Sequence, residues 1–177
     1  MAKAGDVLIH PLTGERITFL QTSADTDGEL LQIEIEMQPN EFVTSEHIHP
    51  QQEEHLRVLA GSARFQLRGW QQELTAGQEL VIPSGMPHFW WNDGSEPLRL
   101  IVEYRPALQT EAFYESIFRH ALDDSARLPN AMQTAVIAQA HQRELQLSGT
   151  RGIAQRMLYG ALAPVARSLG YRGQLPA

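Results

Sequence analysis

The sequence predicts a mainly β protein, a sandwich or barrel of short strands, followed by a helical C-terminal part. Up to about Pro106, short apolar segments are separated by turn-forming residues, which is typical of a sandwich or barrel and not of alternating strands and helices. Beyond Pro106, apolar residues recur at helical spacing instead. The length of 177 residues and the hydrophobic content of 42% suit one main domain with its own core.

The clearest strand lies at residues 30–37, where apolar and polar side chains alternate, so that one face is expected to be buried and the other wet. Residues 53–70 predict two strands that are joined by a tight hairpin at Ala60-Gly61-Ser62. Further strands are predicted at residues 17–21, 79–83, 88–92 and 98–105.

Three helices are predicted in the C-terminal part. The first begins with Thr110 as its cap, the second spans about residues 130–147 and ends at Ser148-Gly149, and the third spans about residues 152–169. Pro164 is expected to kink the third helix. The apolar stripe of the first helix contains Tyr114, Ile117, Phe118, Ala121 and Leu122, and that of the third contains Ile153, Met157, Leu158, Ala161, Leu162, Val165 and Leu169.

The composition argues against several classes of function. The net charge of −7 disfavours a nucleic-acid partner, because binding to phosphates needs clustered basic residues. Cysteine is absent, so any metal has to bind to nitrogen and oxygen atoms. No apolar run has the length of a secretion signal or of a membrane span, and a soluble cytoplasmic protein is therefore expected.

Charge is distributed unevenly along the chain. Residues 148–177 contain four arginines and no acidic residue, whereas residues 1–147 contain 10 basic and 21 acidic side chains. An apolar helix with flanking arginines can lie on a membrane surface. The favoured alternative is that this tail packs on the acidic barrel or on a partner subunit, because helical periodicity is first of all a packing signal.

Three histidines and a glutamate predict a metal centre. His47 and His49 lie two positions apart, so in an extended chain their side chains project to the same face. Glu54 lies on the same strand face as Leu56 and Val58, so it is expected to point into the barrel. Glu53 lies on the opposite, more polar face, which favours Glu54 as the ligand. His88 follows a turn that two prolines and a glycine make rigid.

Three imidazoles and one carboxylate suit a single divalent ion such as Mn, Fe, Co, Ni or Zn, and they leave coordination positions free for water or substrate. Glu54 is also the candidate catalytic base. The other histidines fit no such pattern and are interpreted as ordinary core or surface side chains. They are His10, His55, His120 and His141.

Two motifs of the sequence resemble those of the cupin superfamily. They read His47-x-His49-x4-Glu54-x6-Gly61 and Gly77-x5-Pro83-x-Gly85-x2-His88-x3-Asn92. The second motif fits at every position. In the first, Glu41 stands six residues before His47, where the family usually has a glycine. The resemblance covers about residues 10–106.

The resemblance implies an antiparallel jelly-roll β-barrel, which is assigned to residues 1–107. It says nothing about residues 108–177, which their helical periodicity predicts to be an extension packed on the barrel or on a partner subunit. It implies the metal ligands His47, His49, Glu54 and His88, and structural roles for the motif glycines, Pro83 and Asn92. Similar cupins commonly pair through sheet faces. The adjacent outward aromatics Phe89 and Trp91 therefore favour a homodimer, with cover by the helical tail as the alternative.

The side chains that the alternation of the strands directs into the barrel predict a substrate pocket that favours a partly apolar or aromatic molecule. Trp90 and Tyr104 suit core packing as well as the pocket, and Arg64 or Arg68 facing inward would favour an anionic substrate instead. The predicted pocket residues are Leu56, Val58, Phe65, Leu67, Trp90 and Tyr104.

Fold and metal do not fix the reaction. The first hypothesis is a dioxygenase-like enzyme with a redox-active metal. The second is an isomerase or lyase in which the ion polarises a carbonyl and a carboxylate moves a proton. The third is a noncatalytic cupin that binds a small molecule.

Overall fold

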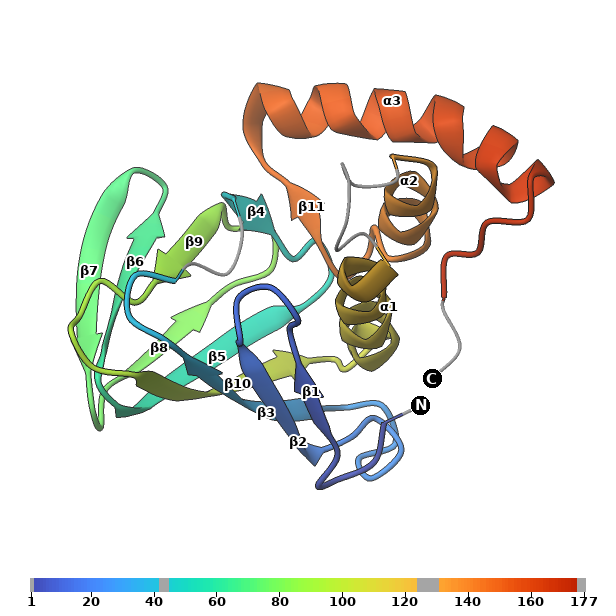
Figure 1. Ribbon diagram of the computed structural model, residues 1–177. Helices are drawn as coiled ribbons and strands as arrows, with labels where there is room; N and C mark the ends of the chain where they lie inside the picture. The colour runs from blue at the N-terminus through green and yellow to red at the C-terminus, as the bar shows by residue number, and fades with distance from the viewer. Residues whose placement is uncertain (1, 42–44, 124–130, 175–177) are drawn as a thin grey trace.

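The computed structural model describes residues 2–41, 45–123 and 131–174. Its strands form a six-stranded and a five-stranded antiparallel sheet, and three helices gather at one side of them (Figure 1). The apolar core lies within the two sheets and continues into the first helix. The predicted architecture, a mainly β antiparallel jelly roll with a helical extension, is confirmed.

The six-stranded sheet has the order β1-β2-β3-β10-β5-β8, and the five-stranded sheet has the order β11-β4-β9-β6-β7. The first sheet consists of β1 (Val7–Ile9), β2 (Arg16–Gln21), β3 (Leu31–Met37), β10 (Leu98–Arg105), β5 (Glu53–Ala60) and β8 (Glu79–Ile82). The second consists of β11 (Gln146–Leu147), β4 (His47–Ile48), β9 (His88–Trp91), β6 (Ser62–Leu67) and β7 (Trp70–Thr75).

The alternation read from the sequence agrees with the burial of the strands. Every second residue of β3 is buried, and in β5 the buried positions are Glu54, Leu56 and Val58. The predicted hairpin joins β5 to β6 at Gly61, whose φ of +75° favours glycine. A Cβ atom at this position would lie 2.7 Å from the carbonyl oxygen of Pro97, so the glycine also allows a close approach of two backbones.

The second helix is shorter than predicted. α2 spans Ala131–Ala140, and β11, which was expected to be its end, pairs instead with β4. The helical pattern of the segment cannot reveal this change, because β4 lies far away in the sequence. Ser148 was expected to end that helix, but it is the residue before α3 (Gly149–Ser168). Asn130, the predicted cap of α2, lies outside the described residues.

α3 packs through the face opposite to the one that the sequence favours. Its buried residues are Gly152, Ala163 and Ala166, and the two alanines contact Val136 of α2. Small side chains let two helices approach closely, which hydrophobicity alone does not indicate. Pro164 lies inside a continuous helix. The large apolar residues Ile153, Met157, Leu158, Val165 and Leu169 are 51% to 74% exposed.

α1 (Thr110–Asp123) begins at Thr110, as predicted. The hydroxyl of Thr110 donates to the carbonyl of Ala107 and accepts from the amide of Gln52, which ties the start of α1 to the segment before β5. The aromatic stripe of α1 turns toward the barrel, where Phe118 contacts the ring of His10 edge-on. Within the described ranges, no helix is long and apolar enough to cross a membrane.

Candidate metal centre

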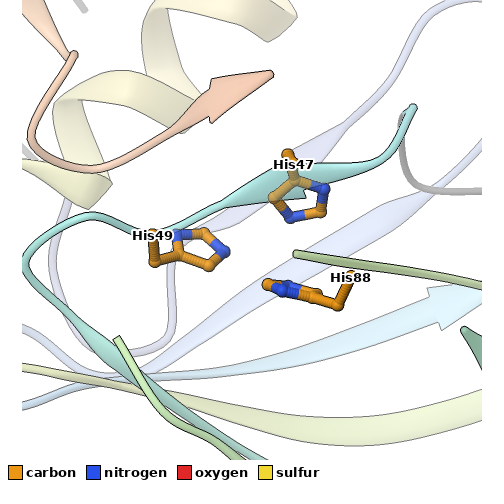
Figure 2. Close-up of side chains that lie close together, drawn as sticks. All are labelled: His47, His49 and His88. Atoms are coloured by element: carbon orange, nitrogen blue, oxygen red, sulfur yellow. The ribbon is translucent and has the colours of Figure 1, made fainter. Parts of the chain in front are cut away.

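Three buried imidazole rings from two paired strands converge on one point (Figure 2). His47 in β4 lies directly opposite His88 in β9, and His49 follows β4. One nitrogen atom of each ring lies within 4.8 Å of the corresponding atoms of the other two. This set of nitrogen atoms is close enough to bind a single metal ion.

Glu54 reaches the same point from the other sheet. Its Oε2 atom lies 2.9 Å from Nε2 of His88 and 3.7 Å from Nε2 of His49, and the side chain is 2% exposed. Glu53 points outward and contacts His55. The structure therefore brings together the four side chains that the sequence predicts as ligands, with β4 and β9 on one side and β5 on the other.

Each of the three histidines is oriented by a backbone carbonyl at its Nδ1 atom. A carbonyl oxygen only accepts, so Nδ1 carries the proton and Nε2 keeps its lone pair. Metal-binding histidines are usually held in this way. The acceptors are the carbonyls of Ser45, Glu144 and Met86, at 3.0, 2.6 and 2.8 Å from Nδ1 of His47, His49 and His88, respectively.

The turn before β9 fixes His88 relative to the segment that carries His49. The N–H of Gly85 donates to the carbonyl of His49 at 2.9 Å, and the hydroxyl of Ser84 donates to the carbonyl of Pro50 at 2.7 Å. Gly85 has a φ of +75°, a conformation that favours glycine. This turn explains how two histidines distant in the sequence come to face one point.

Burial and mutual charge set the protonation of the cluster. Burial lowers the pKa of His47 to about 3, and the neighbouring His88 and His49 act in the same direction; burial also lowers the pKa of His49. Burial opposes a charge on His88, but contact with Glu54 raises the pKa of His88 above its usual range. Burial likewise opposes ionisation of Glu54, yet contact with His88 and the charges of the histidines hold its pKa at about 2.

The buried donor atoms fit a divalent cation. Within the described residues, Nε2 of His49, Nε2 of His88 and Oε2 of Glu54 are buried and make no hydrogen bond of good geometry. Nε2 of His88 and Oε2 of Glu54 lie 2.9 Å apart, but their alignment is poor for a hydrogen bond. Buried polar atoms without partners are costly, and one borderline divalent ion would satisfy all of them. His47, His49, Glu54 and His88 are the residues that would hold it.

A cavity of about 440 Å³ opens beside this cluster, a volume within the usual range for small-molecule sites. Aromatic side chains form part of its wall, namely Trp90 of β9, Tyr104 of β10, and Phe113, Tyr114 and Phe118 of α1. Tyr104 of β10 lies opposite Glu54 of β5, which places the ring of Tyr104 beside the four candidate metal ligands. The hydroxyls of Tyr104 and Tyr114 lie 2.7 Å apart.

The lining corrects the predicted pocket. Trp90 and Tyr104 belong to the cavity wall. The other predicted residues point inward but pack in the apolar core; they are Leu56, Val58, Phe65 and Leu67. Leu56, Val58 and Phe65 lie further along their strands from the candidate metal ligands, where side chains of the two sheets fill the interior. Leu67 lies opposite His88 on the neighbouring strand but outside the cavity lining. The alternation along a strand shows which side chains point into the barrel. It does not show which of them pack in the core and which line the cavity.

Sequence reasoning missed the part of the wall that lies outside the motifs. The stripe of α1 was visible as an amphipathic face, but no signal showed that it faces a cavity. Glu41 was visible only as a departure from the first motif. The missed lining residues include His10, Glu15, Glu41, Phe113, Phe118, Glu144 and Leu145.

Residues 33–104 match the cupin domain family. The chain is similar to the polyketide synthase protein CurC of Streptomyces cyaneus, with 39% identity over 70 residues, and to the tetracenomycin polyketide synthase protein TcmJ of Streptomyces glaucescens, with 32% identity over 72 residues. The matched regions cover 40% and 41% of this chain and 45% and 48% of those proteins. The chain thus spans about half the length of the curated relatives it matches.

Solved structures share the fold. KdgF from Halomonas sp. matches 60% of this chain and 92% of its own, with a TM-score of 0.52 and 16% identity. A predicted oxalate decarboxylase from Thermotoga maritima matches 60% of this chain and 98% of its own, with a TM-score of 0.53 and 17% identity. Residues 33–104, which match the family model and carry both sequence motifs on two antiparallel sheets, therefore form a cupin domain.

Proposed function

We propose that this protein is a metal-dependent enzyme that acts on a small, partly aromatic organic molecule. The observation that carries this proposal is the position of the four buried donor side chains beside the aromatic cavity of about 440 Å³. A bound divalent ion would supply either a redox centre for reaction with O2 or a Lewis acid that polarises a carbonyl.

The first reaction that we propose is dioxygenase-like oxidation of the substrate. The aromatic wall formed by Trp90, Phe113 and Phe118 would hold an apolar ring and exclude water from the reacting atoms. The similarity to polyketide synthase proteins supports a substrate of polyketide type, since such molecules carry both carbonyl groups and rings. Glu54 would serve as a ligand and as an acceptor for a substrate proton.

A second candidate, an isomerase or lyase, is favoured by the paired hydroxyls in the wall. Burial raises the pKa of both Tyr104 and Tyr114 above the usual range, so both stay protonated near neutral pH. One hydroxyl donates to the other, and Tyr104 also contacts Glu54, so a carbonyl oxygen of the substrate would compete with Glu54 for the remaining proton. A carboxylate that moves a proton between carbons would complete this chemistry without a redox-active metal.

Elemental analysis of protein purified without an affinity tag tests the proposal, with the His47→Ala, His49→Ala double variant as control. Near-stoichiometric iron, manganese, nickel or cobalt that is lost in the variant supports oxygen chemistry, which is then measured as O2 consumption with hydroxylated aromatic compounds. Zinc favours the isomerase or lyase. A protein that takes up no metal after reconstitution contradicts the proposed enzyme and leaves the noncatalytic binding protein.

A further inference from the structure

We propose that the cavity selects neutral or cationic aromatic molecules and rejects anionic ones. This inference rests on the proposed function, because it names the class of substrate for the same cavity. The charged side chains of the cavity wall are the physical basis of this selection.

Carboxylates determine the charge of this wall. The glutamates that line it are Glu15, Glu41, Glu54 and Glu144, and no arginine or lysine is among the described residues of the lining. A divalent ion held by three neutral histidines and Glu54 would leave one positive charge against Glu41, Glu144 and Glu15, and because the pKa of Glu15 is about 7, Glu15 is only partly ionised near neutral pH. The net charge of the cavity wall and the ion together therefore stays negative.

The arginines that would reverse this sign point elsewhere. Arg64, which would favour an anionic substrate if it faced inward, pairs with Asp93 at 2.7 Å. Arg68 is exposed at the end of β6. Neither side chain is part of the cavity lining. A phosphate or carboxylate group of a ligand would therefore find no side-chain cation among the described residues of the wall.

Glu15 and Glu41 already repel each other at the side of the cavity. Burial raises the pKa of Glu15 to about 7, and the charge of Glu41 acts in the same direction. His10 and Tyr114 are the other titratable side chains of the wall near this pair. An anionic ligand would add another like charge, whereas a cation or a hydroxyl donor would relieve the repulsion.

Glu144 supplies an independent sign that the wall accepts a donor. The side chain is 3% exposed, and Oε1 accepts the N–H of Gln109 at 3.1 Å. Oε2 is buried and has no hydrogen-bond partner among the described residues. The carbonyl of the same residue holds His49, so this carboxylate has a fixed position beside the metal cluster. A ligand hydroxyl or ammonium group would provide the missing donor.

Three probes on one aromatic scaffold test this selection: 2-naphthol, 2-naphthoate and 2-naphthylmethylammonium. Their dissociation constants are measured by calorimetry on the full-length protein loaded with zinc, which is redox-inert, so no turnover is needed. We expect the neutral and cationic probes to bind at least about tenfold more tightly than 2-naphthoate. In Glu15→Gln/Glu144→Gln, the preference against 2-naphthoate should fall by at least about tenfold. Glu29→Gln, which removes one exposed charge outside the cavity lining, should leave the order and ratios unchanged.

Equal or tighter binding of 2-naphthoate to the wild-type protein would overturn the inference, and so would the absence of binding by all three probes at millimolar concentration. An unchanged preference in the double variant would also overturn it, because the carboxylates would then not be its cause. The order of the probes does not depend on catalysis. A protein that shows this order without turnover would contradict the proposed function alone.

Discussion

His88→Ala is the substitution that tests the metal centre most directly. Nε2 of His88 lies 2.9 Å from Oε2 of Glu54 and faces the point shared with His47 and His49, so its loss removes one of four donors. Loss of a partner that only orients a metal ligand typically weakens metal binding by about 10-fold to 100-fold. Loss of the ligand itself should weaken binding by at least about 100-fold.

This weakening translates into thermal stability. At a metal concentration of 100 times the wild-type dissociation constant, binding adds about 2.7 kcal/mol to the free energy of unfolding. A variant that binds about 100-fold more weakly gains only about 0.4 kcal/mol under the same conditions. The difference of about 2.3 kcal/mol corresponds to a melting temperature lower by roughly 5 to 9 °C for a chain of this size.

The assay is calorimetric melting of each protein with and without metal, together with elemental analysis. Only the shift caused by metal is compared, because His88→Ala also removes the partner of Glu54 and changes the stability of the metal-free protein. His120→Ala is the matched control, since His120 hydrogen-bonds to Thr134 away from the cluster. A full metal shift in His88→Ala, or an equal loss in His120→Ala, would refute the assignment of the ligands.

Three further predictions concern the free energy of unfolding, measured with urea. The pKa of Glu15 is raised from 4.5 to about 7 in the folded protein, so the folded state binds the extra proton, and stability falls as pH rises from 4.5 to 7. In the presence of a metal chelator, the free energy of unfolding of Glu15→Gln should therefore exceed that of the wild type at pH 8, by up to about 3 kcal/mol, but not at pH 4. If the free energy of unfolding depends on pH equally in both proteins, this prediction is contradicted. Gly61→Ala should cost more than about 1 kcal/mol, because its φ is positive and a carbonyl lies 2.7 Å from the new Cβ atom, and a neutral effect would exclude this geometry. Ala166→Leu should cost about 1 to 3 kcal/mol by overpacking, while Met157→Ala, at a side chain 74% exposed, should change stability by less than about 0.5 kcal/mol. The reverse order would mean that another surface covers that face of α3.

The barrel could be predicted because its signals are local. Strands with one buried face show a period of two, and the motif glycines occupy backbone conformations that other residues rarely adopt. Asn92 illustrates a motif residue with a structural role: it is buried, and its amide donates to the carbonyls of Gln38 and Glu96. Such requirements follow from a few neighbouring residues and can be recognised from their spacing.

The helical part was predicted less well because its arrangement depends on distant partners. The end of α2 is decided by the pairing of β11 with β4, which its own sequence does not encode. In α3, the small residues Ala163 and Ala166 pack against α2, while larger apolar residues stay exposed. A hydrophobic stripe indicates which face a helix would bury most favourably, but the space left by its neighbours decides which face it buries.

The four candidate metal ligands could be recognised from local motifs, whereas much of the cavity wall comes from segments outside those motifs. This difference has a consequence for function. The family match over residues 33–104 contains the metal cluster and Glu41, but it omits Glu15, the aromatic residues of α1 and Glu144. Glu144 nevertheless orients His49 through its carbonyl, and α1 closes the cavity beside Tyr104. Under the proposed function, relatives that share only the matched region would share the metal ligands but bind different molecules. The substrate would then be decided by the residues that surround the cupin motifs.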